Sequence, residues 1–447
     1  MPFSDMSSSL EPLLFQMKQY KNLTKATIEI LPSSGQQVYL GGSKIQFTLP
    51  YASVLSLEDI ALSFEFQGVN PKTDVSIMPP QDISSLIAEI DIKVNGSTVQ
   101  NLTRYSDIVN LLNLFKNNKT KNNVLQNTNT MMKKWNNAGV LSTQQNNDYN
   151  VLANGKKQYV INNWHGLLGK RGEEVSSNFI DTNMFGEVVI SFTLHKANVC
   201  FNSSVKAAGT IGTSTNDNYQ LSDCKLSIVR YNLPDGYSDA IKNNLKGGTK
   251  YQIAFDHYNF VSTSASTSTA SIRFNENSRD IKALWAFFSD TTRDNTSVPT
   301  AFNTKTQTSH YFDYQNLLHA TSQFQIGSVL MPQNKMNTTE VFLENMRAVS
   351  GLRNGNVELH PRILTVEDFQ DMAFVSILSL EMTEGMTIQS NDGKKLLSGL
   401  SSEQLPISCV YTYTNNTGNF NNKQLNVMTI TTRLLVIESG QQTYVEI

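Results

Sequence analysis

The sequence predicts an all-β protein made of two tandem eight-stranded jelly rolls, with short helices and long loop insertions. Segments that alternate apolar and polar residues dominate the chain of 447 residues, and such alternation is typical of strands with one buried face. These segments also recur in the same order in two halves of the chain. Each half holds about 200 residues, which suits a jelly roll better than an immunoglobulin sandwich of about 100.

In the first half, five segments show the alternation expected of half-buried strands. They are Val38–Leu40, Lys44–Leu49, Ile60–Phe66, Ile90–Val94 and Val188–Leu194. Four more follow in the second half: Tyr251–Phe255, Ser271–Phe274, Phe324–Val329 and Val427–Val436. The strands do not alternate with helices, so we expect antiparallel sheets.

Three short segments have helical character. Apolar residues recur at helical spacing in Ser106–Phe115 and in Thr338–Val349, and both segments start with capping residues. A third helix is expected over Asp235–Leu245, because Gly247 and Gly248 then end it.

The order of these features indicates an internal repeat. The segment Asp59–Phe66 is repeated in pattern by Asp280–Phe288. The strand and helix that follow Asp59–Phe66 have counterparts about 233 residues later in the chain. We expect Val427–Val436 to be the counterpart of Val188–Leu194 in the second half. The predicted domains are an N-terminal arm (1–35), a first jelly roll (36–232) with a large loop insertion at about 116–160, a linker helix and turn (233–250), and a second jelly roll (251–447).

The amino-acid composition and the net charge exclude some classes of function. Hydrophobic residues make up 39% of the chain, enough for a core, whereas charged residues make up only 17% and the net charge is -2. A protein that coats nucleic acid is expected to be basic, so direct nucleic-acid binding is not indicated. Polarity comes largely from 47 asparagines, 14 of them in residues 101–150. Asparagine suits ordered turns, so this stretch predicts long surface loops.

Neither secretion nor a membrane anchor is predicted. The first 16 residues lack the basic and apolar regions of a signal peptide, and no apolar run approaches the roughly 18 residues of a membrane span. The cysteines Cys200, Cys224 and Cys409 form no CxxC pair. A disulfide between the first two is possible by spacing, but we expect free thiols.

No catalytic, cofactor or metal site is predicted. His310, His319 and Asp313 come nearest to a metal-ligand cluster, but they fit no ligand motif. Gly166–Gly172 contains glycines and a lysine without the ending of a phosphate-binding loop. The acidic pairs Glu58–Asp59 and Glu367–Asp368 are adjacent in sequence, and neighbouring side chains on an extended segment point to opposite faces.

Two tryptophans leave a sugar-binding alternative open. Trp135 and Trp164 lie in or near the large insertion and could stack on a sugar, although packing within the protein is the simpler interpretation. Trp285 lies in an apolar run and is expected in the core. The lysines around the insertion, from Lys116 to Lys134, are diluted by asparagine and are expected to solvate a loop.

Several stretches, taken together and in order, resemble a known family. They are Gly41–Pro50, Leu57–Phe66, Ile83–Leu112, Tyr219–Pro234, Ser278–Phe288 and Ser398–Ser401. The third runs from a strand through a glycine turn into a short helix that begins near a tyrosine. The fourth resembles the last strand of a first jelly roll, and the fifth resembles an early strand of a second. The family is the double jelly-roll major capsid proteins of tailless icosahedral DNA viruses, of the virophage and polinton-like virus type.

The resemblance implies a structural protein without enzymatic activity or a cofactor. It implies a homotrimeric, pseudo-hexameric capsomer that tiles an icosahedral shell. The implied partners are further copies of the chain, penton and minor capsid proteins, and an internal membrane in some virions. The protein would be made in the host cytoplasm or nucleus and end in the virion. The alternative is a virion spike or adhesin that binds glycans.

Overall fold

The computed structural model describes the strands, the short helices and the short turns between them. The described residues are 24–51, 53–69, 75–77, 80, 82–114, 156–169, 179–203, 218–232, 243, 251–265, 269–291, 293–294, 310–314, 321–348, 369–370, 373–380, 399–401, 406–412, 423–437 and 443–446. Of the helix expected over Asp235–Leu245 only residue 243 is described, and it is helical. Most of the insertion at 116–160 lies outside the described residues.

The first half of the chain forms two main antiparallel sheets. Sheet 1a has the strand order β1-β12-β4-β8, with β2 paired to β12 and β9 paired to β4. Its strands are β1 (Thr24–Ile30), β2 (Val38–Leu40), β4 (Val54–Val69), β8 (Lys156–Ile161), β9 (Phe179–Asp181) and β12 (Asn218–Asn232). Sheet 1b has the order β3-β10-β6-β7. Its strands are β3 (Lys44–Thr48), β6 (Ile87–Val94), β7 (Ser97–Leu102) and β10 (Val188–Leu194).

The second half repeats this arrangement. Sheet 2a has the order β13-β20-β15-β18, with β21 paired to β20, and sheet 2b has the order β14-β19-β16-β17. The strands of sheet 2a are β13 (Tyr251–Ser264), β15 (Ile281–Asp290), β18 (Ser376–Ser379), β20 (Lys423–Ile437) and β21 (Thr443–Glu446). Those of sheet 2b are β14 (Thr269–Asn275), β16 (Thr321–Ile326), β17 (Val329–Met336) and β19 (Pro406–Thr412).

The two halves have the same topology, so the predicted internal repeat is present. Sheet 1a matches sheet 2a and sheet 1b matches sheet 2b strand by strand, with eight strands common to each half. A helix follows the second hairpin strand in both: α1 (Tyr105–Leu114) after β7 and α6 (Thr338–Ala348) after β17. The fold is therefore all-β, with two tandem eight-stranded jelly rolls.

The predicted match between Val188–Leu194 and Val427–Val436 is wrong. Val188–Leu194 forms β10, which lies between β3 and β6, and its counterpart is β19. Val427–Val436 lies in β20, whose counterpart is β12. β10 and β19 are both seven residues long, whereas β20 has fifteen, and an apolar strand pattern by itself does not identify the partner of a strand.

The strands form where the sequence alternates. Strand β14 is exposed and buried at alternate residues along all seven positions, as expected when one face packs on the core. β1 lies within the segment expected to be an N-terminal arm, and it pairs with β12 from Thr24 to Ile30. The segment Phe324–Val329, expected as one strand, is instead the end of β16, a turn at Gly327, and the start of β17.

The helices begin close to where the sequence predicts. In α6, Glu340 N–H donates to Asn337 Oδ1 at 3.0 Å while Asn337 N–H donates to Glu340 Oε2 at 2.9 Å. This reciprocal pair is a capping box, which satisfies two backbone donors at the start of the helix. Its inner side is held by Asn345, which donates to Val375 O and accepts from Ile377 N–H.

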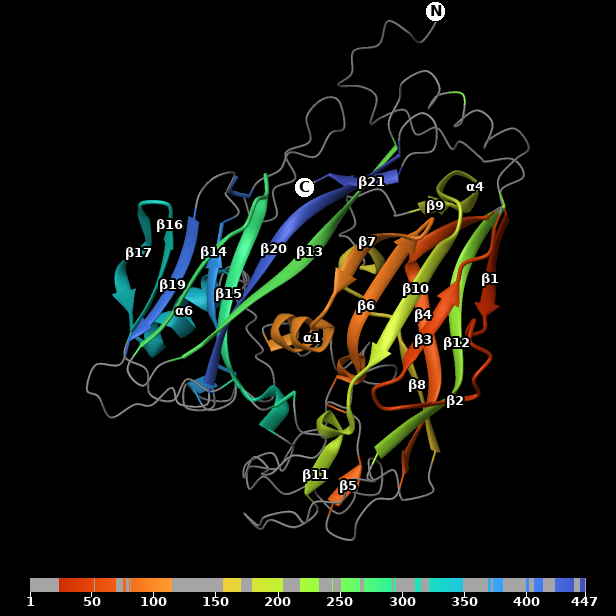
Figure 1. Cartoon of the computed structure of the whole chain (residues 1–447), viewed down its shortest axis with the longest axis horizontal. Helices are drawn as coiled ribbons and strands as arrows, with labels where there is room; N and C mark the ends of the chain where they lie inside the picture. Colours follow the sequence, from red (N-terminus) through yellow and green to blue (C-terminus); the bar gives the residue numbers. More distant parts are fainter. Residues whose placement is uncertain are drawn as a thin grey trace, which may run out of the picture.

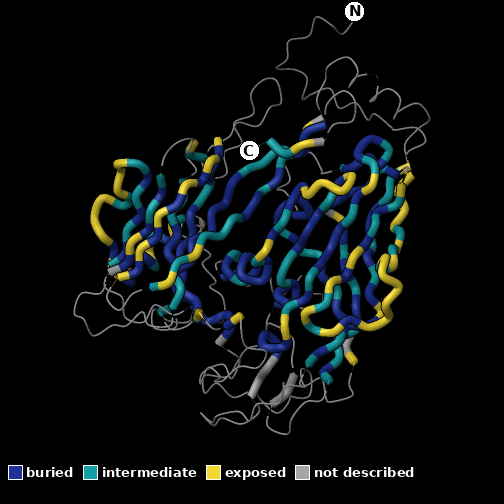
Figure 2. Tube along the Cα trace, in the orientation of Figure 1, coloured by how far each residue is buried: buried dark blue, intermediate teal, exposed yellow. Residues whose placement is uncertain are grey.

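Figure 1 shows the four sheets one behind another along the long axis of the molecule, with α1 between the two jelly rolls. Sheet 2b lies at the left end, and the strands of sheet 1a lie at the right end. Figure 2 shows that buried residues run through both sandwiches and through α1, while exposed residues gather at the two ends. The junction around α1 is thus part of the protein interior.

Candidate functional site at the junction of the two jelly rolls

The candidates for chemistry that the sequence offered do not come together in a site. Asp313 is buried, whereas His319 and the pair Glu367–Asp368 lie outside the described residues. Within the described ranges, no group of three or more histidine, cysteine or acidic side chains is placed to hold a metal. Among those same residues, no helix has the length and apolar character needed to cross a bilayer.

The glycine loop that begins at Gly166 has a packing role. Gly166–Leu168 forms a short 3-10 helix, η5, that contacts β13 of the second jelly roll. Gly166 has φ +79°, and a Cβ there would lie 2.5 Å from the Gln100 side chain. Only glycine fits both constraints, so this glycine allows Gln100 to reach the junction.

The described tryptophans are core residues. Trp164 is 2% exposed, donates its Nε1–H to Ile60 O at 2.7 Å, and stacks on Phe192 at 5.0 Å between ring centroids. Its use as an exposed sugar platform is therefore ruled out. Trp285 is buried, as predicted. Trp135 lies outside the described residues.

All three cysteines are free and buried, which confirms the expectation of free thiols. Burial raises the pKa of the Cys224 thiol to about 12 and raises the pKa of Cys200 well above its usual value. These thiols stay protonated at neutral pH and are poor nucleophiles.

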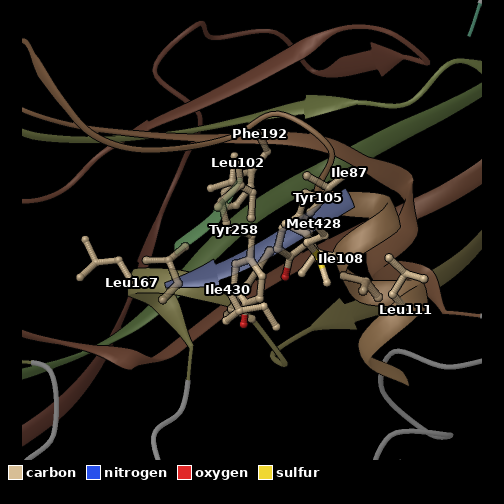
Figure 3. Close-up of a cluster of buried hydrophobic side chains, with 14 of the residues drawn as sticks. Ile87, Leu102, Tyr105, Ile108, Leu111, Leu167, Phe192, Tyr258, Met428 and Ile430 are labelled. Carbon is tan, nitrogen blue, oxygen red and sulfur yellow. The ribbon is translucent and has the colours of Figure 1, made fainter. Parts of the chain in front are cut away.

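The two jelly rolls meet in a buried contact. Helix α1 of the first jelly roll packs against the face of sheet 2a that points away from sheet 2b. Figure 3 shows Ile108 and Leu111 of α1 beside Met428 of β20, with Tyr258 and Ile430 in the same cluster. All of these side chains are at least nine-tenths buried, so the two halves share one hydrophobic contact.

A buried ionic network lies within this junction. Asp107, in the first turn of α1, accepts hydrogen bonds from Arg293 at 2.5 and 3.1 Å and from the Tyr314 hydroxyl at 2.9 Å. Arg104 donates to the same carboxylate at 2.8 Å. Burial alone would raise the pKa of Asp107, but the Arg293 and Arg104 guanidinium groups hold it well below its usual range. The carboxylate is thus charged and fully paired.

Arg104 joins the network to sheet 2a. Its Nη1 donates to Asn426 Oδ1 at 2.7 Å and to Ser262 Oγ at 3.3 Å. Its guanidinium lies 4.9 Å from the Phe260 ring centroid, a distance at which cation–π attraction contributes. Because Arg104 and Arg293 hold Asp107 from different segments, α1 is fixed in one position on the second jelly roll.

Further polar contacts surround the network. Gln100 of β7 donates to Asp256 O at 3.0 Å and accepts from Leu167 N–H at 2.8 Å. Asn198 donates to Arg293 O at 2.8 Å, and Lys196 donates to Asp294 O at 2.9 Å. The junction therefore combines an apolar centre with polar groups paired across it, as in a stable protein interface.

His195 lies beside the ionic network. Its Nε2 is 3.2 Å from Ser106 Oγ, and its ring packs edge-on to Tyr311 at 4.7 Å between centroids. Loss of solvent lowers the pKa of His195 to about 4, and burial likewise lowers that of His257, inside the second jelly roll, to about 4. Both side chains are neutral at pH 7.

This pair predicts acid sensitivity. An unfolded histidine has a pKa near 6.5, so the unfolded chain binds more protons below that pH and stability falls as the pH drops from about 6.5 towards 4. We expect a loss of about 2–3 kcal/mol for each histidine over that window. Urea unfolding at pH 7 and pH 4.5 measures it, and His195→Gln should reduce the loss. Equal stability at both pH values would contradict the prediction.

Sequence reasoning did not find this junction. Asp107 and Arg293 are 186 residues apart, and neither stands in a motif. A partial signal is present in Asp107, the one charged residue in the helix Tyr105–Leu114. Its partners depend on how two jelly rolls pack, and a local pattern does not encode that.

The strand order and the buried junction define a double jelly-roll protein. Three solved virus structures share this fold. A chain of the PBCV-1 virus capsid has a TM-score of 0.57 and 12% identity, covering 97% of this chain and 99% of that one. A Sputnik virophage chain has a TM-score of 0.58 and 11% identity, covering 100% and 91%. The mavirus major capsid protein has a TM-score of 0.52 and 9% identity, covering 94% and 90%.

The chain is similar to these proteins over nearly its whole length. The resemblance to double jelly-roll capsid proteins is therefore confirmed at the level of the fold. No protein-family model matches the sequence, and no curated protein matches it either. The likeness thus rests on the arrangement of the strands.

Proposed function

We propose that the chain is the major capsid protein of a tailless icosahedral DNA virus, with a structural role and no enzymatic one. Three copies would assemble into a pseudo-hexameric capsomer that tiles the shell. The observation that carries this proposal is the tandem repeat: two jelly rolls of one topology, fixed to each other by a buried junction. Three such pairs supply six similar units around a ring.

The junction supports this role physically. A tile must keep its shape when it meets its neighbours, and a buried ionic network with an apolar centre prevents the two jelly rolls from moving independently. The low charge also fits. A net charge of -2 on 447 residues limits repulsion between many copies packed side by side.

The same proposal covers the partners and the location. We expect the chain to associate with itself, with penton and minor capsid proteins, and with an internal membrane where the virion has one, without reading nucleic-acid sequence. It would be made in the host cytoplasm or nucleus and reside in the virion. The expected division is an arm (1–35), a first jelly roll (36–232), a linker (233–250) and a second jelly roll (251–447); because Thr24–Ile30 pairs with β12, we propose that the first jelly roll starts at β1 and that the arm is the segment before it.

Assembly is directly testable. The purified full chain is expected to form a trimer of about 150 kDa, three times 49.9 kDa, by light scattering. Electron microscopy should then show particles with a hexagonal outline. A monodisperse monomer at physiological salt would refute the capsid proposal and favour the glycan-binding spike, for which Trp135 remains the one candidate platform.

A further inference from the structure

The repeat allows the interior of one jelly roll to be compared with that of the other, position by position. In the first jelly roll β1 pairs with β12, and in the second β13 pairs with β20. Ile281 of β15 pairs with Thr431 of β20. The equivalent residue of the first half, Ile60 of β4, lies beside Ile228 in the register of β4 on β12. Ile228 and Thr431 therefore hold matching places in the two jelly rolls.

The matched positions differ in polarity. In the first jelly roll they are apolar and pack in the core: Ile28, Ile30, Leu226 and Ile228. Their counterparts in the second jelly roll are polar: His257, Asn259, Thr429 and Thr431. These polar side chains point into the second sandwich, because their strand neighbours Tyr258 and Ile430 lie beside α1 (Figure 3) and successive side chains of a strand point to opposite faces. The interior of the second jelly roll is thus polar where that of the first is apolar.

One side of this polar cluster is hydrogen-bonded. Glu276, just after β14, is 6% exposed. Its Oε2 accepts a hydrogen bond from Asn259 Nδ2 at 2.8 Å and another from the Thr429 hydroxyl at 3.3 Å. The buried carboxylate is therefore held by partners on sheet 2a.

The other side of the cluster has three atoms without a hydrogen-bond partner among the described residues. They are His257 Nδ1, the Thr431 hydroxyl and Arg433 Nε. His257 is 8% exposed and Thr431 is fully buried. Arg433 shares their face of the sheet, because it pairs with Phe255, which is buried in the core. Buried polar atoms without partners cost stability, and a bound ligand would supply the missing hydrogen bonds.

The chemistry of these three atoms suits an anion. The Arg433 guanidinium and the Thr431 hydroxyl can donate hydrogen bonds, and a neutral histidine such as His257 donates from Nδ1 in one of its two tautomers. Loss of solvent, and then the Arg433 guanidinium, lowers the pKa of His257 to about 4. Burial lowers the pKa of Arg433, and the Glu276 carboxylate offsets part of that change. His257 and Arg433 are thus close enough to act on one ligand.

We propose that His257, Thr431 and Arg433 bind a small oxyanion, a phosphate or a carboxylate, inside the second jelly roll. Arg433 is half-buried, so its guanidinium connects the buried cluster with solvent. The site belongs to the interior of one chain, so it goes beyond the capsid proposal and does not depend on it. Trimer formation and anion binding can each fail without the other.

The first test is direct binding. Isothermal titration calorimetry of the full chain at pH 7 is run with inorganic phosphate and, separately, with acetate, with sodium chloride at equal ionic strength as the blank. We expect saturable binding of one anion per chain. Arg433→Met is expected to weaken it at least about tenfold, the value of one charge-assisted hydrogen bond. Binding of phosphate alone or of acetate alone supports the site and identifies the class of its ligand.

The first jelly roll provides the matched control. Arg230 holds the place that corresponds to Arg433, and its Nε is also buried without a partner. Its neighbours on the adjacent strands are the apolar residues Ala26 and Leu55, so Arg230→Met removes the same charge without touching the polar cluster. Anion binding should be unchanged in this variant. The proposal is overturned if neither anion binds saturably, or if both arginine variants bind as the wild type does or lose affinity equally.

The second test separates a binding role from a structural one. Thr431→Val keeps the shape of the side chain and removes an unpaired hydroxyl, so its Tm in chloride buffer should equal or exceed that of the wild type. Phosphate raises the Tm of proteins in general by its exclusion from their surface, so the measured quantity is the gain in Tm from chloride to phosphate buffer. This gain should be smaller in Thr431→Val than in the wild type. An equal gain, or a fall in Tm already in chloride, would show that the hydroxyl serves the fold and not a ligand.

Discussion

Replacing Asp107 by asparagine is expected to lower the free energy of unfolding by about 3–5 kcal/mol, because removal of one charge from a buried pair leaves the other without compensation. Arg293 has a side chain only 5% exposed and donates two hydrogen bonds to this carboxylate. Asparagine keeps the shape of the side chain but not its charge. Urea unfolding of the full chain at pH 7 measures the change.

A surface ion pair provides the control. Arg347 pairs with Glu344 on α6, where the side chains are 59% and 41% exposed, and Glu344→Gln should change the free energy of unfolding by no more than about 1 kcal/mol. The double variant Asp107→Asn with Arg293→Met should recover part of the loss, since it removes the unpaired charge. An Asp107→Asn loss as small as that of the control would show that the network does not hold the junction.

Replacing Trp164 by alanine is expected to cost about 3–5 kcal/mol, the range for a large buried aromatic side chain. The change removes the stack on Phe192 and the hydrogen bond to Ile60 O, and it leaves a cavity next to Tyr105 of α1. Thermal unfolding followed by circular dichroism should show a clear fall in Tm.

Tyr51→Ala is the control for this experiment, because Tyr51 is 72% exposed and isolated surface substitutions change stability by about 0.5 kcal/mol or less. Trp164→Phe should fall between the two, since it keeps the aromatic contact but loses the hydrogen bond. A Trp164→Ala protein as stable as Tyr51→Ala would place the tryptophan outside the core.

Local patterns predicted the elements well. Val188–Leu194 was expected as a strand and forms β10 with those bounds, and Thr338–Val349 was expected as a helix and forms α6 to within one residue. Alternation and capping are properties of neighbouring residues, so a sequence shows them directly. The fold class and the existence of a repeat followed from the order of such elements.

Pairing between strands was harder to predict. β10 was matched to β20, yet β10 corresponds to β19 and β20 corresponds to β12. Strand partners are set by turns and crossovers between distant segments, and two apolar strands look alike to a local pattern. For the same reason, β1 was expected to be an arm although it is an edge strand on β12.

The period of each segment, the internal repeat and the low charge depend on residue type and on spacing along the chain, so they can be read directly from the sequence. The tertiary structure alone decided that α1 is enclosed while α6 keeps an exposed face, and that Asp107 meets Arg293. The physical reason is that a buried charge requires a partner and an apolar face requires a cover. The partner of the charge and the cover of the apolar face can both come from segments that are distant in the sequence.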